Sequence, residues 1–299
     1  MKTRMSWVAV AGVAFLVVLA MGAPAVFAQG AQEANAESFE RSFPMNAGGT
    51  LVVENRKGTI HVTGSETNQV VVSVRKVFEG GSDKERQAWM AGTKVNFDGA
   101  ANHVSVRVEY PDWNCVFCTN VRDEVDLTIA APRAVNVELE GNRPDMAISS
   151  IRGDIRISSN RSRIAIRSTE GGIRIETNRG DVRLSDVAIK GRLDLTSNRA
   201  EAVIEAKSVS GNADLETERG SIVLRMPATV GVDLEYVGGR RANFHCDFPV
   251  TTNENGAELN DVSGRVGRTG AHITGKINQG GARMMLRTTR GTISLEKGS

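Results

Sequence analysis

The chain has 299 residues, of which 40% are hydrophobic and 24% are charged, and its formal net charge is +2. This composition is typical of a globular protein and excludes a disordered or collagen-like chain. Only the N-terminus carries an apolar run long enough to cross a bilayer as a helix, which excludes a multi-span membrane channel.

The N-terminus has the layout of a secretory signal. Lys2 and Arg4 precede an apolar stretch over residues 7–20, and the small-residue pattern Val26-Phe27-Ala28 follows. We therefore expect a signal peptide over residues 1–28, cleaved after Ala28, and an exported protein that is periplasmic or extracellular. The alternative is an uncleaved signal anchor, because residues 7–28 are long enough to span a membrane.

Cleavage would leave a chain without net charge, since it removes Lys2 and Arg4 but none of the 35 acidic residues. The remaining Lys and Arg residues form no block, which argues against nucleic acid as the partner. Residues 29–40 are rich in Ala, Gln, Asn and Glu and predict a flexible linker. The folded domain is then expected over residues 41–297.

A repeat organises the middle of this domain. Four segments each begin with Gly and continue with alternating aliphatic residues, and a turn and a second alternating strand follow each of them. The segments are Gly153-Asp154-Ile155-Arg156-Ile157, Gly172-Ile173-Arg174-Ile175, Gly191-Arg192-Leu193-Asp194-Leu195 and Gly211-Asn212-Ala213-Asp214-Leu215. The turns are Asn160-Arg161, Asn178-Arg179, Asn198-Arg199 and Glu218-Arg219. A unit of roughly 20 residues cannot bury its own apolar face, so the copies must stack.

The predicted fold is therefore all-β: a single-domain β-solenoid, similar to a β-helix, built of roughly 20-residue rungs. Weaker copies extend it upstream, over residues 58–62 and 125–139, and downstream, over residues 284–295. Period-2 alternation places one charged residue of each rung above the next on the outward face. This outward column contains Arg156, Arg174, Asp194 and Asp214.

One segment departs from the strand pattern. Ser82-Asp83-Lys84-Glu85 is a capping box and predicts a short helix near residues 83–91. We expect this helix to cover an end of the solenoid or to pack on its side, because an uncovered terminal rung exposes free strand edges. A loop is expected from Pro111 to Asn120.

Several segments together resemble a known family. They are residues 51–62 (LVVENRKGTIHV), 125–132 (VDLTIAAP), Phe248-Pro249-Val250, 274–295 (TGKINQGGARMMLRTTRGTISL) and the glycine repeats above. Their order and spacing resemble the toastrack domain, also called the putative-adhesin domain, of bacterial envelope and secreted proteins. The resemblance implies a β-solenoid outside the cytoplasm, and it supplies no catalytic residues.

The three cysteines leave alternatives open. Cys115 and Cys118 form a CxxC motif in the expected loop, and in an oxidising compartment they predict a local disulfide with Cys246 buried and free. A bridge from Cys246 to one of the pair is the alternative. A zinc site of Cys115, Cys118, His245 and Cys246 is disfavoured, because neighbours on a strand point to opposite faces. We expect no metal and no cofactor.

Other motifs have plainer structural explanations. His61, His103, His245 and His272 show no metal-binding spacing, and no nucleophile elbow is present. Arg152-Gly153-Asp154 and Arg179-Gly180-Asp181 spell the integrin-binding tripeptide, but the repeat places each at a corner rather than on an extended loop tip.

The carboxylates offer the one enzymatic hypothesis. Asp194, Asp214, Glu216 and Glu218 fall on neighbouring rungs and could serve polysaccharide cleavage. However, repeating carboxylates usually form a solvated face, and only Trp89 and Trp113 remain for sugar stacking after cleavage of the signal.

The leading hypothesis is an exported, non-enzymatic solenoid without catalytic residues that binds or scaffolds an envelope or extracellular protein or polysaccharide. A carbohydrate-active enzyme, a lyase or hydrolase, and a membrane-tethered envelope sensor are the alternatives. The sequence does not determine the oligomeric state.

Overall fold

The computed structural model describes residues 36–112, 121–252, 258–259, 262–265 and 270–298. The signal peptide and the Cys115/Cys118 pair lie outside these residues. Within them, no helix is both long and apolar enough to cross a bilayer.

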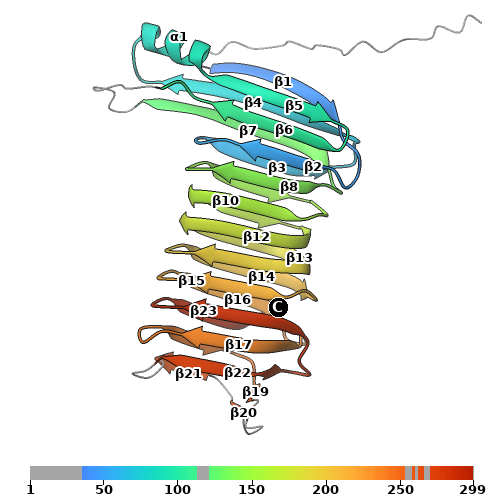
Figure 1. Cartoon of the computed structure of the whole chain (residues 1–299), viewed down its shortest axis with the longest axis vertical. Helices are drawn as coiled ribbons and strands as arrows, with labels where there is room; N and C mark the ends of the chain where they lie inside the picture. Colours follow the sequence, from blue (N-terminus) through green and yellow to red (C-terminus); the bar gives the residue numbers. More distant parts are fainter. Residues whose placement is uncertain (1–35, 113–120, 253–257, 260–261, 266–269, 299) are drawn as a thin grey trace, which may run out of the picture.

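The described chain consists of one helix, α1 (Asp83–Gly92), and strands that belong to one hydrogen-bonded network (Figure 1). The strands are β1 (Ala36–Pro44), β2 (Thr50–Glu54), β3 (Thr59–Ser65), β4 (Gln69–Glu79), β5 (Lys94–Ala100), β6 (His103–Glu109), β7 (Arg122–Pro132), β8 (Asn136–Gly141), β9 (Asp145–Ser149), β10 (Ile155–Arg161), β11 (Ile164–Arg167), β12 (Glu170–Arg179), β13 (Asp181–Ser197), β14 (Glu201–Val209), β15 (Ala213–Thr217), β16 (Ser221–Pro227), β17 (Val232–Gly238), β18 (Asn243–Cys246), β19 (Val250–Thr252), β20 (Glu258–Leu259), β21 (Val262–Arg265), β22 (Ala271–Ile277), β23 (Ala282–Thr288) and β24 (Thr292–Gly298).

The expected β-solenoid is confirmed, and each of its coils contributes one strand to each of two parallel ladders. The first ladder, which we call face A, runs β6, β2, β8, β10, β12, the second half of β13, β15, β23 and β17. The second, face B, runs β7, β3, β9, β11, the first half of β13, β14, β16, β24 and β18. Figure 1 shows the ladders as a tall stack of nearly parallel strands.

Alternation of side chains makes the core. In β10, Ile155 and Ile157 are buried while Arg156 between them is exposed, and the same pattern repeats in the coils above and below. Ile155 lies in register with Val137 on one side and Ile173 on the other. The buried aliphatic residues therefore form continuous columns, and their burial is the main stabilising contribution of the stack.

The coils do not follow one another in chain order. The N-terminal coil, β2 and β3, lies between the β6/β7 coil and the β8/β9 coil. The C-terminal coil, β23 and β24, lies between the β15/β16 coil and the β17/β18 coil. Both terminal coils are thus interior layers of the solenoid.

Antiparallel strands close both ends of the stack. At one end β1 and β4 extend face B and β5 extends face A. The predicted helix α1 lies at this end (Figure 1), with both hydrogen bonds of the Ser82/Glu85 capping box present and Trp89 fully buried. At the other end β22 pairs with β17, β19 pairs with β22 and β20, and β21 pairs with β18.

The structure differs from the expected linker over residues 29–40, because β1 already begins at Ala36. Phe39 and Phe43 of β1 both pack against Phe97 of β5, with ring centroids 6.2 and 5.7 Å apart. Burial of these aromatic rings favours an ordered strand in a segment whose polar composition suggested a linker.

Candidate functional site

The outward column of charged residues on face A has the predicted register. Arg156 lies beside Arg174, Arg174 beside Asp194, and Asp194 beside Asp214 on successive strands. The next strand is β23 of the C-terminal coil, which places Met285 beside Asp214.

The candidate catalytic carboxylates are held by arginines rather than left free. Arg192 contacts both Asp194, at 2.5 Å, and Asp214, at 3.5 Å. Arg287, from the inserted C-terminal coil, contacts both Asp214, at 3.0 Å, and Glu216, at 3.1 Å. The hydrogen bond to the Asp194 carboxylate raises the pKa of Arg192. Each of these carboxylates is therefore engaged in at least one ion pair.

Glu218 is separate from this group. It lies in the turn after β15 and pairs with its neighbour Arg219 at 3.1 Å. The structure therefore brings together Asp194, Asp214 and Glu216 but places Glu218 on the edge of the solenoid.

Face A carries a shallow, open hollow of about 370 Å³, whose carboxylates are Glu138, Asp154 and Asp194. Gly172 and Gly191 contribute no side chains there, and Arg156, Arg174 and Arg192 surround the space they leave. A second hollow of about 230 Å³ continues it over Asp214 and Arg287. No aromatic residue lines either hollow among the residues described, and Trp89, a candidate for sugar stacking, is buried at the end of the stack.

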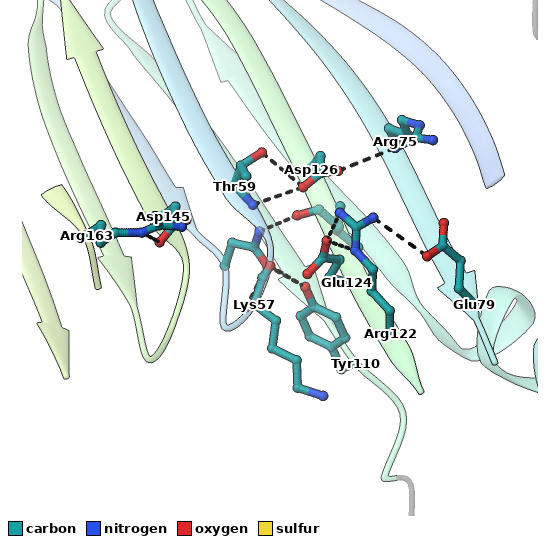
Figure 2. Close-up of polar contacts among 12 residues, drawn as sticks. Lys57, Thr59, Arg75, Glu79, Tyr110, Arg122, Glu124, Asp126, Asp145 and Arg163 are labelled. Atoms are coloured by element: carbon teal, nitrogen blue, oxygen red, sulfur yellow. Dashed lines mark hydrogen bonds and ion pairs between the residues drawn. The ribbon is translucent and has the colours of Figure 1, made fainter. Parts of the chain in front are cut away.

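A separate polar cluster connects the N-terminal coil to its neighbour (Figure 2). The Tyr110 hydroxyl donates to Asn55 Oδ1 at 2.6 Å and lies 3.0 Å from the Lys57 carbonyl, while Asn55 Nδ2 donates to the Val125 carbonyl at 2.8 Å. Asn55 is 2% exposed. Burial raises the pKa of Tyr110 well above its usual range, so the hydroxyl remains a donor.

Charged pairs surround this cluster. The Lys57 ammonium group lies 2.7 Å from both oxygens of Asp123, and Thr59 donates to Asp126 through its main-chain amide and its hydroxyl. Arg122 pairs with Glu124 on the same strand (Figure 2). The partners of the turn lie on β7, apart from Tyr110, which directly follows β6. We therefore interpret the cluster as a structural lock that holds the turn between β2 and β3.

The cysteine and histidine motifs of the described residues have structural explanations. Cys246 is a buried free thiol that donates to the Phe248 carbonyl at 3.5 Å, while the adjacent His245 is partly exposed on the opposite side of β18. Among the residues described, no group of three or more His, Cys, Asp or Glu side chains could hold a metal ion. The disulfide expected between Cys115 and Cys118 lies outside the described residues and stays a prediction.

The two Arg-Gly-Asp segments lie at corners of the coil. A Cβ on Gly153 would lie 2.2 Å from the Val135 carbonyl oxygen, and one on Gly180 would lie 1.9 Å from that of Ser162. These glycines therefore allow close stacking of one corner on the next. Asp154 accepts a hydrogen bond from the Gly172 amide, which ties it to the neighbouring coil.

Sequence reasoning treated one set of residues only as turn formers. Seven turns from face A to face B, those at the ends of β2, β8, β10, β12, β13, β15 and β23, carry an arginine, and main-chain hydrogen bonds join these turns from coil to coil. We call this row the arginine edge; its members, in spatial order, are Arg56, Arg143, Arg161, Arg179, Arg199, Arg219 and Arg290. The repeat predicts the turns of Arg161, Arg179, Arg199 and Arg219, and extending it to the weaker copies adds Arg56, Arg143 and Arg290.

Comparison with known proteins identifies relatives of the whole domain. The model of the family Toastrack DUF4097 matches residues 43–296. Among curated proteins, none matches.

Solved structures also match, at low identity and low TM-score. A protein from Clostridium sporogenes named "putative cell adhesion protein" is 12% identical with a TM-score of 0.34, and the match covers 88% of this chain and 100% of that one. Proteins named "putative adhesin" from Bacteroides fragilis (8% identity, TM-score 0.35) and Parabacteroides merdae (9%, 0.33) match 88% and 87% of this chain and 97% of their own chains.

Proposed function

The chain belongs to the Toastrack DUF4097 family, and we propose that it is an exported, non-enzymatic solenoid that binds or scaffolds a partner in the cell envelope or outside the cell. The signal-like residues 1–28 support the location. The observation that carries the binding role is the open hollow of face A, which is lined by both arginines and carboxylates and in which Asp194 pairs with Arg192.

The hollow suits recognition better than cleavage. Glycoside hydrolysis uses one carboxyl group with a raised pKa and a second that stays ionised. On face A, Arg192 and Arg287 engage Asp194, Asp214 and Glu216 in ion pairs, so none of the three carboxylates is set apart from the others by its contacts. Side chains fixed on stacked strands can instead place charged groups at regular intervals, which suits binding of an extended partner.

The experiment is to incubate the purified protein with an array of envelope and extracellular polysaccharides, and to measure both retention and the release of reducing or unsaturated ends. Retention without release is the expected result. The pair of substitutions Arg174→Gln and Arg192→Gln should weaken the retention, and the matched pair Arg167→Gln and Arg183→Gln on face B should leave it unchanged.

Product release that Asp194→Asn or Asp214→Asn abolishes would replace the binding role with the enzymatic one. If nothing is retained or cleaved, the polysaccharide form of the proposal fails, and the protein would be tested against envelope proteins. Recovery of an intact N-terminus in membranes would favour the membrane-tethered sensor.

A further inference from the structure

The arginine edge is a row of cations built by the stacking itself. The amides of Arg143, Arg161, Arg199, Arg219 and Arg290 each donate to a carbonyl in the preceding turn of the stack, and Arg161 lies in register with Arg179. Neighbouring turns are therefore separated by the strand spacing of a sheet, about 4.8 Å. The edge runs along the side of the stack toward which the arrows of β8, β10 and β12 point (Figure 1).

The asparagines beside these arginines stiffen the turns. Asn160 donates its side-chain amide to Asn142 at 3.0 Å, and Asn178 donates to Asn160 at 3.1 Å. The asparagine side chains thus bond to one another from turn to turn, whereas the arginine that follows each asparagine lies on the surface. The arginines of these turns, Arg143, Arg161, Arg179 and Arg199, are exposed.

Most of these cations form no ion pair with the residues that the structure describes. Among the residues described, the only ion pair on the edge joins Arg219 to Glu218, and the Arg56 guanidinium lies 5.2 Å from the ring centroid of Tyr110. Arg240 and Arg241 extend the row, in the turn before β18. Like charges on adjacent strands repel one another, so the row lowers the stability of the fold. Binding of an anionic ligand would offset this repulsion.

Acidic residues limit the width of the row. Glu54 and Glu216 on face A pair with Arg107 and Arg287, and Asp145 on face B pairs with Arg163. Three more carboxylates, Glu140, Asp181 and Glu201, lie on the strands beside the edge. A broad anionic surface such as a lipid bilayer would meet these carboxylates, whereas a single extended chain would contact only the arginines.

We infer that the arginine edge binds a linear anionic polysaccharide, one that bears carboxylate, sulfate or phosphate groups at regular intervals, lying along the axis of the stack. This inference rests on the proposed binding function and goes beyond it, because it adds a second surface, separate from the hollow of face A, and names the ligand class of that surface. Arginine suits these groups because its planar guanidinium donates two parallel hydrogen bonds to an oxyanion. Single-stranded nucleic acid is disfavoured, because its binding sites stack bases on aromatic rings, and Tyr110, under Arg56, provides the one ring contact found on the edge among the residues described.

The test compares three probes on the full-length purified protein: polygalacturonate, a single-stranded DNA of matched charge, and vesicles of phosphatidylglycerol. Wild-type protein should bind polygalacturonate, and the affinity should fall at least about tenfold between about 50 and 200 mM salt. Replacing Arg161, Arg179 and Arg199 together with Gln should weaken binding at least about tenfold.

The matched control replaces Arg152, Arg167 and Arg183 with Gln, which removes the same charge from exposed positions away from the edge. It should bind as the wild type does. Equal losses in both triple variants, or no polygalacturonate binding at all, would overturn the inference. Preferential binding of DNA or of vesicles would overturn it in favour of those partners.

The outcomes separate this inference from the proposed function. If polysaccharides are retained equally well by the wild type and the Arg161/Arg179/Arg199 variant, the binding function stands and the arginine edge is not its site. If bound polysaccharide is cleaved, the non-enzymatic function fails even where the arginine edge is required for binding.

Discussion

The side-chain amide of Asn55 donates a hydrogen bond to the main-chain carbonyl of Val125, and the two residues lie 70 positions apart in the chain. Asn55 also accepts from Tyr110 and is almost fully buried. One side chain thus joins the N-terminal coil to strand β7, beside which that coil is inserted.

Replacing Asn55 with Ala should lower the free energy of unfolding by about 1–3 kcal/mol, because the Val125 carbonyl and the Tyr110 hydroxyl lose their buried partner. Urea unfolding followed by circular dichroism measures this change. The exposed Thr67→Ala is the control and should remain within about 0.5 kcal/mol of the wild type. Equal stability of N55A and the wild type would show that the lock contributes nothing.

Replacing Leu195 with Asp should unfold several coils, since its side chain is 1% exposed and a buried unpaired carboxylate costs several kcal/mol. The adjacent Asp194→Asn should change stability by at most about 1 kcal/mol, because Asp194 lies on the outward face. Thermal melting of the two variants compares the inward and outward positions of one strand. A normal melting curve for L195D would contradict the register of β13.

Replacing Gly180 with Ala should destabilise the protein by more than about 1 kcal/mol. The glycine has φ +124°, and a Cβ there would lie 1.9 Å from the Ser162 carbonyl oxygen. Gly298→Ala is the matched control, since its nearest contact would be at an ordinary 3.4 Å. Differential scanning calorimetry of both variants distinguishes a steric effect from a general effect of adding a methyl group.

The Cys246 thiol should be inert in the folded protein, because burial raises its pKa to about 11. Below about pH 8.5 the thiol is protonated in both the folded and the unfolded state and does not affect stability. Between that pH and about 11 only the unfolded state ionises, so stability should fall as pH rises through this range.

The measurement uses a Cys115→Ser/Cys118→Ser background, which leaves Cys246 as the only thiol. A thiol reagent at pH 8 should react after addition of denaturant and not before it. Cys246→Ala in the same background should reduce the alkaline loss of stability. Rapid labelling of the native protein would show that the thiol is accessible.

Deleting residues 282–299 should abolish cooperative unfolding, because β23 and β24 form an interior layer of the stack. Without them, the apolar faces of the coils on either side lose their partner. Deleting only Gly298 and Ser299 should be tolerated. Thermal melting and binding of a hydrophobic dye measure the effect. A normal transition in the long deletion would show that the β17/β18 coil can close directly on β15/β16.

Local features of the fold followed from the sequence. The repeat lengths give the register of Arg174 beside Asp194, and the Ser82/Glu85 capping box begins α1 as expected. The insertion of the terminal coils did not follow, because alternating aliphatic residues fit beside any neighbouring rung. Specific contacts such as those of Asn55 and Arg287 with distant strands select the neighbours, and repeat spacing carries no information about them.

The candidate sites, too, were only partly predictable from the sequence. The carboxylate column of Asp194 and Asp214 was predictable from alternation, but the arginines that neutralise it come partly from the C-terminal coil. The arginine edge was hidden because charge was judged along the chain, where Asp and Glu are interleaved with Arg. Its members gather only when the turns are aligned in space.

The inserted terminal coils also constrain how a solenoid of this kind can change in length. Repeats cannot simply be stacked on either end, because antiparallel strands form the end layers: β1, β4 and β5 at one end and β19 to β22 at the other. Duplication of a unit within residues 153–220 would instead add a layer and leave both caps intact. Each duplication would also add one turn arginine, so the span of the arginine edge could grow in steps of one coil, as would suit recognition of a longer polymer.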